Sequence, residues 1–140
     1  MEVLLVEDDP TDVEMTLEAL NGSRFPIHVE VMADGRRAID YLRNGDGQGD
    51  DRRPDLVLLD LKLPQVSGHE VLAFIKGQAH LKPIPVVVFS SSTDELDVQR
   101  SYGQHANCYV AKPVELDAFM QAIRSVMEFW FGVAELPTST

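Results

Sequence analysis

Residues 55–72 have the sequence DLVLLDLKLPQVSGHEVL. The four apolar residues 56–59 end at Asp60, which is the pattern of a short strand buried on both faces of a sheet. Ser67, with Glu70 three residues later, forms a capping box and predicts that a helix begins there. A buried strand followed by a helix is the repeating unit of α/β proteins. This stretch therefore predicts one such unit in the middle of the chain.

The same unit recurs on both sides of this stretch. Short apolar runs predict four further strands, at residues 3–6, 27–32, 85–89 and 108–111, each followed by apolar residues at helical spacing. Five strands alternating with five helices require right-handed crossovers and a parallel sheet covered on both faces. The predicted fold class is α/β: a flavodoxin-like, doubly wound (βα)5 three-layer sandwich with sheet order 2-1-3-4-5. Its functional site is expected at the carboxyl ends of the strands.

The helix that follows residues 85–89 differs from the others. Ser92 and Glu95 offer a second capping box for its start. Its apolar face consists of little more than Leu96, Val98 and Tyr102. Because a helix with few buried contacts detaches at low cost, we expect this helix to move more easily than the others.

Composition excludes several classes of protein. A chain of 140 residues has the size of one domain, and 44% hydrophobic residues suffice for a packed core. The net charge of −11 repels phosphate backbones, so no nucleic-acid partner is expected. No apolar run reaches the roughly 20 residues of a membrane span, and the first residues contain no basic leader. The single cysteine, Cys108, suits a reducing compartment, so we expect a cytoplasmic protein without a membrane partner.

Polar residues follow the strands at the edge where a parallel sheet gathers its carboxyl ends. They are Glu7, Asp8, Asp60, Ser90 and Lys112. Several carboxylates at one place repel one another unless a cation relieves the repulsion, and oxygen ligands without His or Cys favour Mg²⁺. A hydroxyl group and a lysine beside that ion can hold a phosphoryl group. By contrast, the next acid, at position 9, precedes a proline and is interpreted as a helix N-cap.

Four segments together resemble the signature blocks of CheY-like receiver domains: VLLVEDDP (3–10), DLVLLDLKLPQVSGHEVL (55–72), PVVVFSSS (85–92) and CYVAKPVE (108–115). The resemblance runs from about residue 2 to residue 130. It implies a receiver domain over 1–131 followed by a short tail, 132–140. It also implies a response regulator of a two-component phosphorelay, phosphorylated by a sensor histidine kinase, that is a signalling domain and not an enzyme acting on a separate substrate.

The resemblance also implies a role for individual residues. Asp60 would be the phosphoacceptor, and Mg²⁺ would be held by Glu7, Asp8, Asp60 and the backbone carbonyl of Lys62. Lys112 would neutralise the phosphoryl charge, and the bond between residues 112 and 113 is cis in most receivers.

Two residues would transmit the change. Ser90 would be the switch hydroxyl that bonds the phosphoryl group, and Tyr109 the aromatic residue that turns inward when Ser90 moves. Many receivers have Ala or Gly after the switch hydroxyl, whereas Ser91 stands here and leaves less room beside the phosphoryl group.

The C-terminal helix provides a prediction about assembly. Met120, Met127 and Phe131 form a second apolar stripe beside the one that should pack on the sheet. We expect a homodimer that buries this stripe through the last strand and last helix, although a broad apolar face that covers more core is the alternative. The loop from 44 to 54 and the ending FWFGVAELP (129–137) resemble the Rcp-type receivers paired with phytochromes. This similarity implies a bacteriophytochrome as the upstream kinase, and the downstream protein is unknown.

Three other functions were weighed. A phosphatase that uses Asp60 as a transient nucleophile would carry an aspartate as its acid at position 62, where this chain has a lysine. A flavin-binding protein of the same fold would place hydroxyl and glycine residues after the first strand, but this chain has three acids there, which repel the FMN phosphate. A dimeric adaptor that no longer accepts phosphate stays open, although the site residues are all present.

Overall fold

The computed structural model describes residues 1–44 and 53–137. Its five strands form one parallel sheet in the order β2-β1-β3-β4-β5, which confirms the predicted topology. The strands are β1 (Glu2–Val6), β2 (His28–Met32), β3 (Leu56–Leu59), β4 (Val86–Ser90) and β5 (Cys108–Ala111). The helices are α1 (Pro10–Asn21), α2 (Gly35–Asn44), α3 (Gly68–Gly77), α4 (Glu95–Gly103) and α5 (Leu116–Met127), followed by the π-helix η1 (Glu128–Val133). Most of the predicted loop at 44–54 lies outside the described residues.

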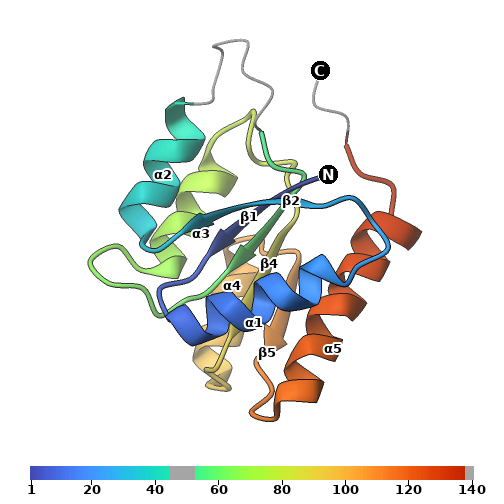
Figure 1. Ribbon diagram of the computed structural model, residues 1–140. Coiled ribbons are helices and arrows are strands. Elements are labelled where there is room, and N and C mark those ends of the chain that lie inside the picture. The colour runs from blue at the N-terminus through green and yellow to red at the C-terminus, as the bar shows by residue number, and fades with distance from the viewer. Residues whose placement is uncertain (45–52, 138–140) are drawn as a thin grey trace.

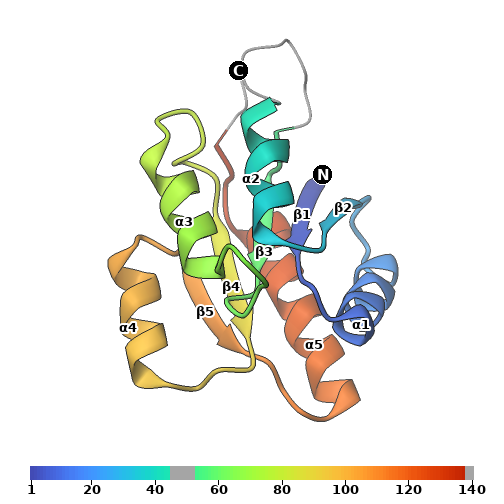
Figure 2. The same cartoon turned by 90° about the vertical axis from the view of Figure 1, so that its left-hand side faces the viewer.

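Helices cover both faces of the sheet, so the molecule has three layers. Figures 1 and 2 show α1 and α5 on one face and α2, α3 and α4 on the other. Along β3, Val57 and Leu59 point into the core beneath α2 and α3, whereas Leu56 and Leu58 point into the core beneath α1 and α5. All four side chains are fully buried. This two-sided burial is the physical reason for the uninterrupted apolar run in the sequence.

In the described part of the chain, no helix combines the length and apolarity that crossing a membrane requires.

Side-chain caps fix where α1 and α3 begin. Asp9 accepts a hydrogen bond from the backbone N–H of Thr11 at 2.9 Å, with Pro10 as the first helical residue, so α1 starts as the sequence predicts. The Oγ of Ser67 accepts from the backbone N–H of Glu70 at 3.3 Å at the start of α3. Both caps end the loops that follow β1 and β3, so they also fix those loops at the carboxyl edge of the sheet.

The predicted capping box of α4 is wrong. The N-cap is Asp94, which accepts from the backbone N–H of Leu96 at 2.9 Å. Ser92 lies before the cap, and its hydroxyl is bonded to Asp97 instead. All nine residues of α4 are described by the structure, and Ser101 is the one that is buried, so the thin apolar face of this helix is confirmed.

The predicted second stripe of the C-terminal helix is wrong in one of its three members. Met127 is 1% exposed and packs in the core with Phe119 and Ile123, because positions 119, 123 and 127 are separated by four residues and share one face of α5. Met120 and Phe131 are half-buried, and the ring of Phe131 packs edge-on against Phe25 at 6.0 Å between centroids. An interface between two copies of the chain therefore cannot include Met127 without unpacking the core.

Gly68 sits where α3 begins directly beneath the end of β3. Its backbone N–H donates to the carbonyl oxygen of Leu61 at 2.9 Å. A Cβ atom at this position would overlap the carbonyl oxygen of Asp60 and the Cα of Leu61, both of which are backbone atoms that cannot rotate away. Glycine is therefore required for the close approach of α3 to the residue that ends β3.

We predict that Gly68→Ala lowers the free energy of unfolding by about 1–3 kcal/mol, because overpacking against backbone forces a shift of α3 or β3. Urea unfolding followed by circular dichroism measures the change. The matched control is Gly77→Ala at the other end of α3, where a Cβ would meet nothing within 4 Å. That variant should be as stable as the parent or more stable by up to about 1 kcal/mol. Equal effects of the two substitutions would contradict the close-approach argument.

Candidate functional site

The pairing of the central strands places Asp60 and Glu7 side by side. The backbone N–H of Asp60 donates to the carbonyl oxygen of Val6 at 3.0 Å, so Asp60 continues the pairing of β3 with β1. The backbone N–H of Glu7 donates to the carbonyl oxygen of Met32 at 3.0 Å and continues the pairing of β1 with β2. Both side chains are buried at the carboxyl edge, as the sequence predicts.

Three acids at this edge can share one metal ion. Glu7, Asp8 and Asp60 each offer a carboxylate oxygen, and these oxygens lie within 4.8 Å of one another. Asp8 is exposed whereas the other two are buried, so the group is accessible from solvent on the Asp8 side. An all-oxygen set of anionic ligands fits a hard divalent cation such as Mg²⁺. Lys62 also lies here: its backbone N–H donates to Asp60 Oδ1 at 3.3 Å, and its side chain is exposed.

Lys112 contacts two of these acids and one further acid. Its Nζ lies 2.6 Å from Glu7 Oε1, 2.7 Å from Asp12 Oδ2 and 3.1 Å from Asp60 Oδ2. The backbone N–H of Lys112 donates to the carbonyl oxygen of Ser90 at 2.8 Å, which continues the pairing of β5 with β4 and brings the side chain over the site. The bond from Lys112 to the following proline is trans and not cis, contrary to the expectation from the resemblance.

The electrostatics of Glu7 and Lys112 reflect this crowding. Burial raises the pKa of Glu7 to about 7, the neighbouring charge of Asp60 adds to the rise, and the contact with Lys112 opposes it. Burial alone would lower the pKa of Lys112, but the carboxylates around its ammonium group outweigh burial and hold the pKa above its ordinary value. The lysine is therefore charged at neutral pH, whereas the Glu7 carboxyl changes its charge near neutrality when no metal is bound.

Asp12 is the member of this cluster that the sequence analysis missed. It lies in the first turn of α1, three residues after the cap Asp9, and its side chain is 22% exposed. The signal was present, because α1 begins at the same edge of the sheet as the other acids. An acid in a first turn is nevertheless common without any partner, since it also suits the helix dipole.

The predicted switch residues lie on the other side of Asp60. Ser90 is fully buried, and its Oγ accepts from the backbone N–H of Ser92 at 3.3 Å. The hydroxyl of Tyr109 donates to the carbonyl oxygen of Ser92 at 2.8 Å. Burial raises the pKa of Tyr109, while its contacts with Ser92 and Ser90 oppose the rise. Ser91, between the two serines, is exposed. One short segment therefore connects Ser90 to Tyr109.

A chain of polar contacts that the sequence analysis missed continues from this segment to α3. The hydroxyl of Ser92 donates to Asp97 Oδ2 at 2.7 Å. The other carboxylate oxygen of Asp97 lies 3.2 Å from Nε2 of His69, which is 5% exposed. Nδ1 of His69 in turn contacts Gln104 Oε1 at 3.0 Å. The polar contacts of Ser92, Asp97, His69 and Gln104 thus connect α4 to α3.

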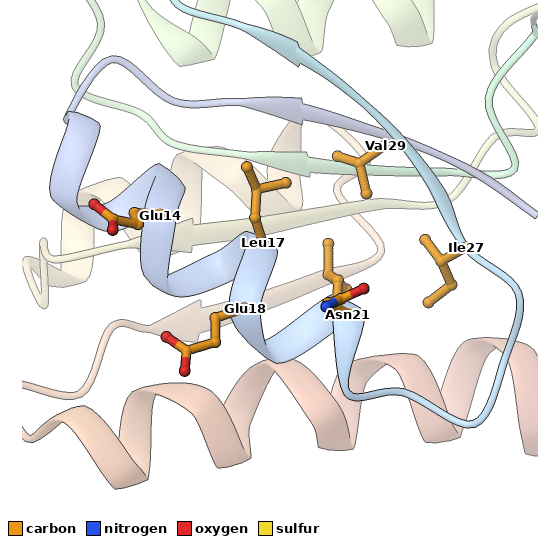
Figure 3. A pocket seen from close by; sticks show the side chains of 7 residues that line it. Glu14, Leu17, Glu18, Asn21, Ile27 and Val29 are labelled. Atoms are coloured by element: carbon orange, nitrogen blue, oxygen red, sulfur yellow. The ribbon is translucent and has the colours of Figure 1, made fainter.

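A hollow among the described residues lies elsewhere, between α1 and β2. Figure 3 shows Glu14 and Glu18 on its helical side and Ile27 and Val29 on its strand side. The acids Glu7, Asp8 and Asp60 do not line it. This hollow is therefore separate from the acids at the carboxyl edge of the sheet.

Comparison with known proteins agrees with this geometry. The model of the response regulator receiver domain family matches residues 3–124. The chain is 40% identical over 130 residues to the probable methanogenesis regulatory protein FilR2 of Methanothrix harundinacea, covering 93% of this chain and 83% of that protein. It is 38% identical over 137 residues to the response regulator Rcp1 of Synechocystis sp., covering 98% of this chain and 93% of that protein.

Two solved structures are similar over nearly the whole chain. The phosphorylated cyanobacterial phytochrome response regulator RcpA superimposes with a TM-score of 0.92 at 44% identity, covering 98% of both chains. The Mn²⁺-bound form of Rcp1 superimposes with a TM-score of 0.90 at 38% identity, covering 98% of this chain and 99% of the other. Family match, fold and the acids at the carboxyl edge of the sheet agree: the chain belongs to the response regulator receiver family of two-component signalling, with the phytochrome-associated Rcp proteins among its relatives.

Proposed function

We propose that this protein is a phosphorylation switch in which Asp60 accepts a phosphoryl group from a sensor histidine kinase. The observation that carries the proposal is the convergence of one ammonium group, that of Lys112, and two further acids, Glu7 and Asp8, on the buried carboxylate of Asp60. Receiver domains are phosphorylated by sensor histidine kinases. A buried carboxylate beside a fixed cation is suited to attack phosphorus, because the cation stabilises the charge that develops on the transferred group.

The reaction has a simple balance. A carboxylate oxygen of Asp60 forms a bond to phosphorus, and the bond from phosphorus to the donor group breaks with its electrons leaving on the donor. Glu7, Asp8, Asp60 and the carbonyl of Lys62 would hold Mg²⁺, which supplies positive charge to the phosphoryl oxygens when it is bound. Lys112 binds another phosphoryl oxygen through Nζ, which already lies 3.1 Å from Asp60 Oδ2.

The output of the switch follows from the contacts of Ser90. A phosphoryl group adds close to two negative charges and several acceptor oxygens. The Ser90 hydroxyl is a donor that can turn to one of these oxygens, and it then gives up the contact with the backbone N–H of Ser92. Because the carbonyl of Ser92 holds the hydroxyl of Tyr109, movement of this segment changes the position of Tyr109 and the start of α4. Ser91, beside the phosphoryl group, tunes how much room the segment has.

A bacteriophytochrome is the proposed upstream kinase. The support is the 44% identity, over nearly the full chain, to RcpA, whose name associates it with a cyanobacterial phytochrome. A homodimer through the last strand and last helix stays a prediction, with Met120 and Phe131 as the remaining members of its stripe.

We predict that the protein gains one phosphoryl group when incubated with Mg²⁺ and acetyl phosphate, and that Asp60→Asn gains none, because the amide is not a nucleophile at phosphorus. Intact-protein mass spectrometry provides the measurement, and circular dichroism checks that the variant is folded. The matched control is Asp117→Asn in the first turn of α5, an exposed acid, which should be labelled like the parent. Labelling of folded Asp60→Asn would contradict the assignment of the phosphoacceptor.

We predict that Mg²⁺ affinity falls about tenfold between pH 8 and pH 6. The pKa of Glu7 is raised to about 7, so its carboxyl is ionised and able to bind metal at pH 8 but largely protonated at pH 6. Isothermal titration calorimetry at constant ionic strength measures the affinity. In Glu7→Gln the affinity should be lower overall and nearly flat over this pH range. An equally steep pH dependence in that variant would show that another group is responsible.

We predict that a bacteriophytochrome histidine kinase transfers phosphate to this protein at least about tenfold faster than a chemotaxis-type histidine kinase, because cognate pairs are selected by complementary surfaces. Radiolabelled, autophosphorylated kinases mixed with equimolar receiver measure the rates. Asp60→Asn provides the background for each kinase. Equal rates from the two kinases would remove the support for a phytochrome partner while leaving the phosphoacceptor assignment intact.

A further inference from the structure

We propose that Asp12 is a positioning residue of the phosphotransfer reaction. It keeps the ammonium group of Lys112 beside Asp60 when a metal ion is bound to the carboxylates of Glu7 and Asp60. This inference rests on the proposed function and adds a residue to it. Asp12 lies outside the four segments that resemble receiver domains. Its proposed role comes from its contact with Lys112 alone.

The first observation is that the hydrogen-bonding capacity of Lys112 is fully used. An ammonium group has three N–H donors, and Nζ of Lys112 has three carboxylate partners, one each from Glu7, Asp12 and Asp60. The contact with Asp12 is 2.7 Å, in the range of strong charge-assisted hydrogen bonds, and shorter than the 3.1 Å contact with Asp60. The lysine side chain is 7% exposed, so water does not compete freely for these donors.

The second observation is that these three partners differ in what else they can bind. Among the residues that the structure describes, the acids close enough to share an ion are Glu7, Asp8 and Asp60, and Asp12 is not one of them. A divalent cation at these acids therefore competes with Lys112 for Glu7 and Asp60 but leaves the Asp12 contact intact. Asp12 then becomes the anchor of the ammonium group, and the two remaining N–H donors are available to phosphoryl oxygens.

The third observation is that Asp12 is itself held in place. The backbone N–H groups of Thr11 and Asp12 both lie within hydrogen-bond distance of Asp9 Oδ1, at 2.9 and 3.4 Å, and Pro10 fixes the first residue of the helix. The first turn of α1 is thus fixed relative to the end of β1. A lysine side chain is a flexible chain of four carbons and loses considerable conformational entropy when it is held in one conformation. A partner that is itself rigid, such as Asp12, is therefore an effective anchor.

The test is a double-mutant cycle on the rate of phosphorylation by acetyl phosphate at saturating Mg²⁺. Asp12→Ala should slow the reaction about tenfold, the effect of losing one charge-assisted hydrogen bond at the reacting group. In a Lys112→Ala background the same substitution should change the rate less than about twofold, because the group that Asp12 positions is gone. Asp12→Asn keeps the size and one acceptor oxygen, and it should fall between Asp12→Ala and the parent.

The matched control is Glu14→Ala, which removes an acid of the same helix. Glu14 is exposed, lines the hollow of Figure 3 and is not among the three carboxylate partners of Lys112, so its removal should leave the rate unchanged. This control separates the specific contact from the general loss of negative charge near an anionic donor.

A second readout does not depend on the reaction. The two Hε protons of a lysine give separate NMR signals when the side chain is fixed and one averaged signal when it is mobile. In Asp12→Ala the signals of Lys112 should stay separate without metal, because Glu7 and Asp60 still hold the ammonium group, and merge when Mg²⁺ is added. In the parent protein they should stay separate in both states.

The outcomes distinguish this inference from the function on which it rests. If the parent protein takes no phosphoryl group from acetyl phosphate or from any kinase, the proposed function fails. If the parent is phosphorylated and Asp12→Ala reacts as fast as Glu14→Ala, the positioning role is overturned and the function stands. A tenfold loss that persists in the Lys112→Ala background also overturns it, because Asp12 then acts on something other than Lys112.

Discussion

Repulsion among carboxylates at the carboxyl edge of the sheet is the constraint on which the site is built. Parallel pairing forces the ends of β1 and β3 to the same edge, and both ends carry acids. Burying several anions together costs several kcal/mol unless positive charge accompanies them. Within the described residues, Lys112 supplies that charge directly, and the raised pKa of Glu7 shows that one ammonium group does not fully offset the burial. A bound cation would therefore stabilise the site by offsetting the repulsion among the carboxylates. A bound group that contacts Lys112 would stabilise it as well.

The sequence predicts the fold and most of the site because both follow from short-range patterns. Uninterrupted apolar runs identify the buried strands, and parallel topology then brings Glu7, Asp60, Ser90 and Lys112 together without knowledge of any side-chain direction. The contacts that were missed depend on such directions. Asp12 reaches Lys112 because of where the cap sets the first turn of α1, and nothing in the spacing of residues reports that rotation.

The two wrong predictions about helices have different origins. Met127 follows Phe119 and Ile123 at intervals of four, so its place on their buried face, and not on an outer stripe, could be predicted from spacing alone. Ser92 has the side chain of a common helix cap, but the carboxylate of Asp97 accepts its hydroxyl and Asp94 caps α4 instead. At Ser92, therefore, a local preference is overruled by a competing hydrogen bond that residue spacing does not reveal.

The two walls of the site differ in how they are attached to the rest of the molecule. On the α3 side, Gly68 allows the backbone of α3 to contact the backbone of Asp60 and Leu61, so this wall cannot move closer to the site. On the α4 side, the attachment consists of hydrogen bonds through Asp97 and His69 and few buried apolar groups, and water can replace such bonds at little net cost. A displacement that begins at Asp60 would therefore be resisted by α3 and taken up by a movement of α4. In the proposed switch, this difference in attachment would set the direction of the displacement, toward α4 and away from α3.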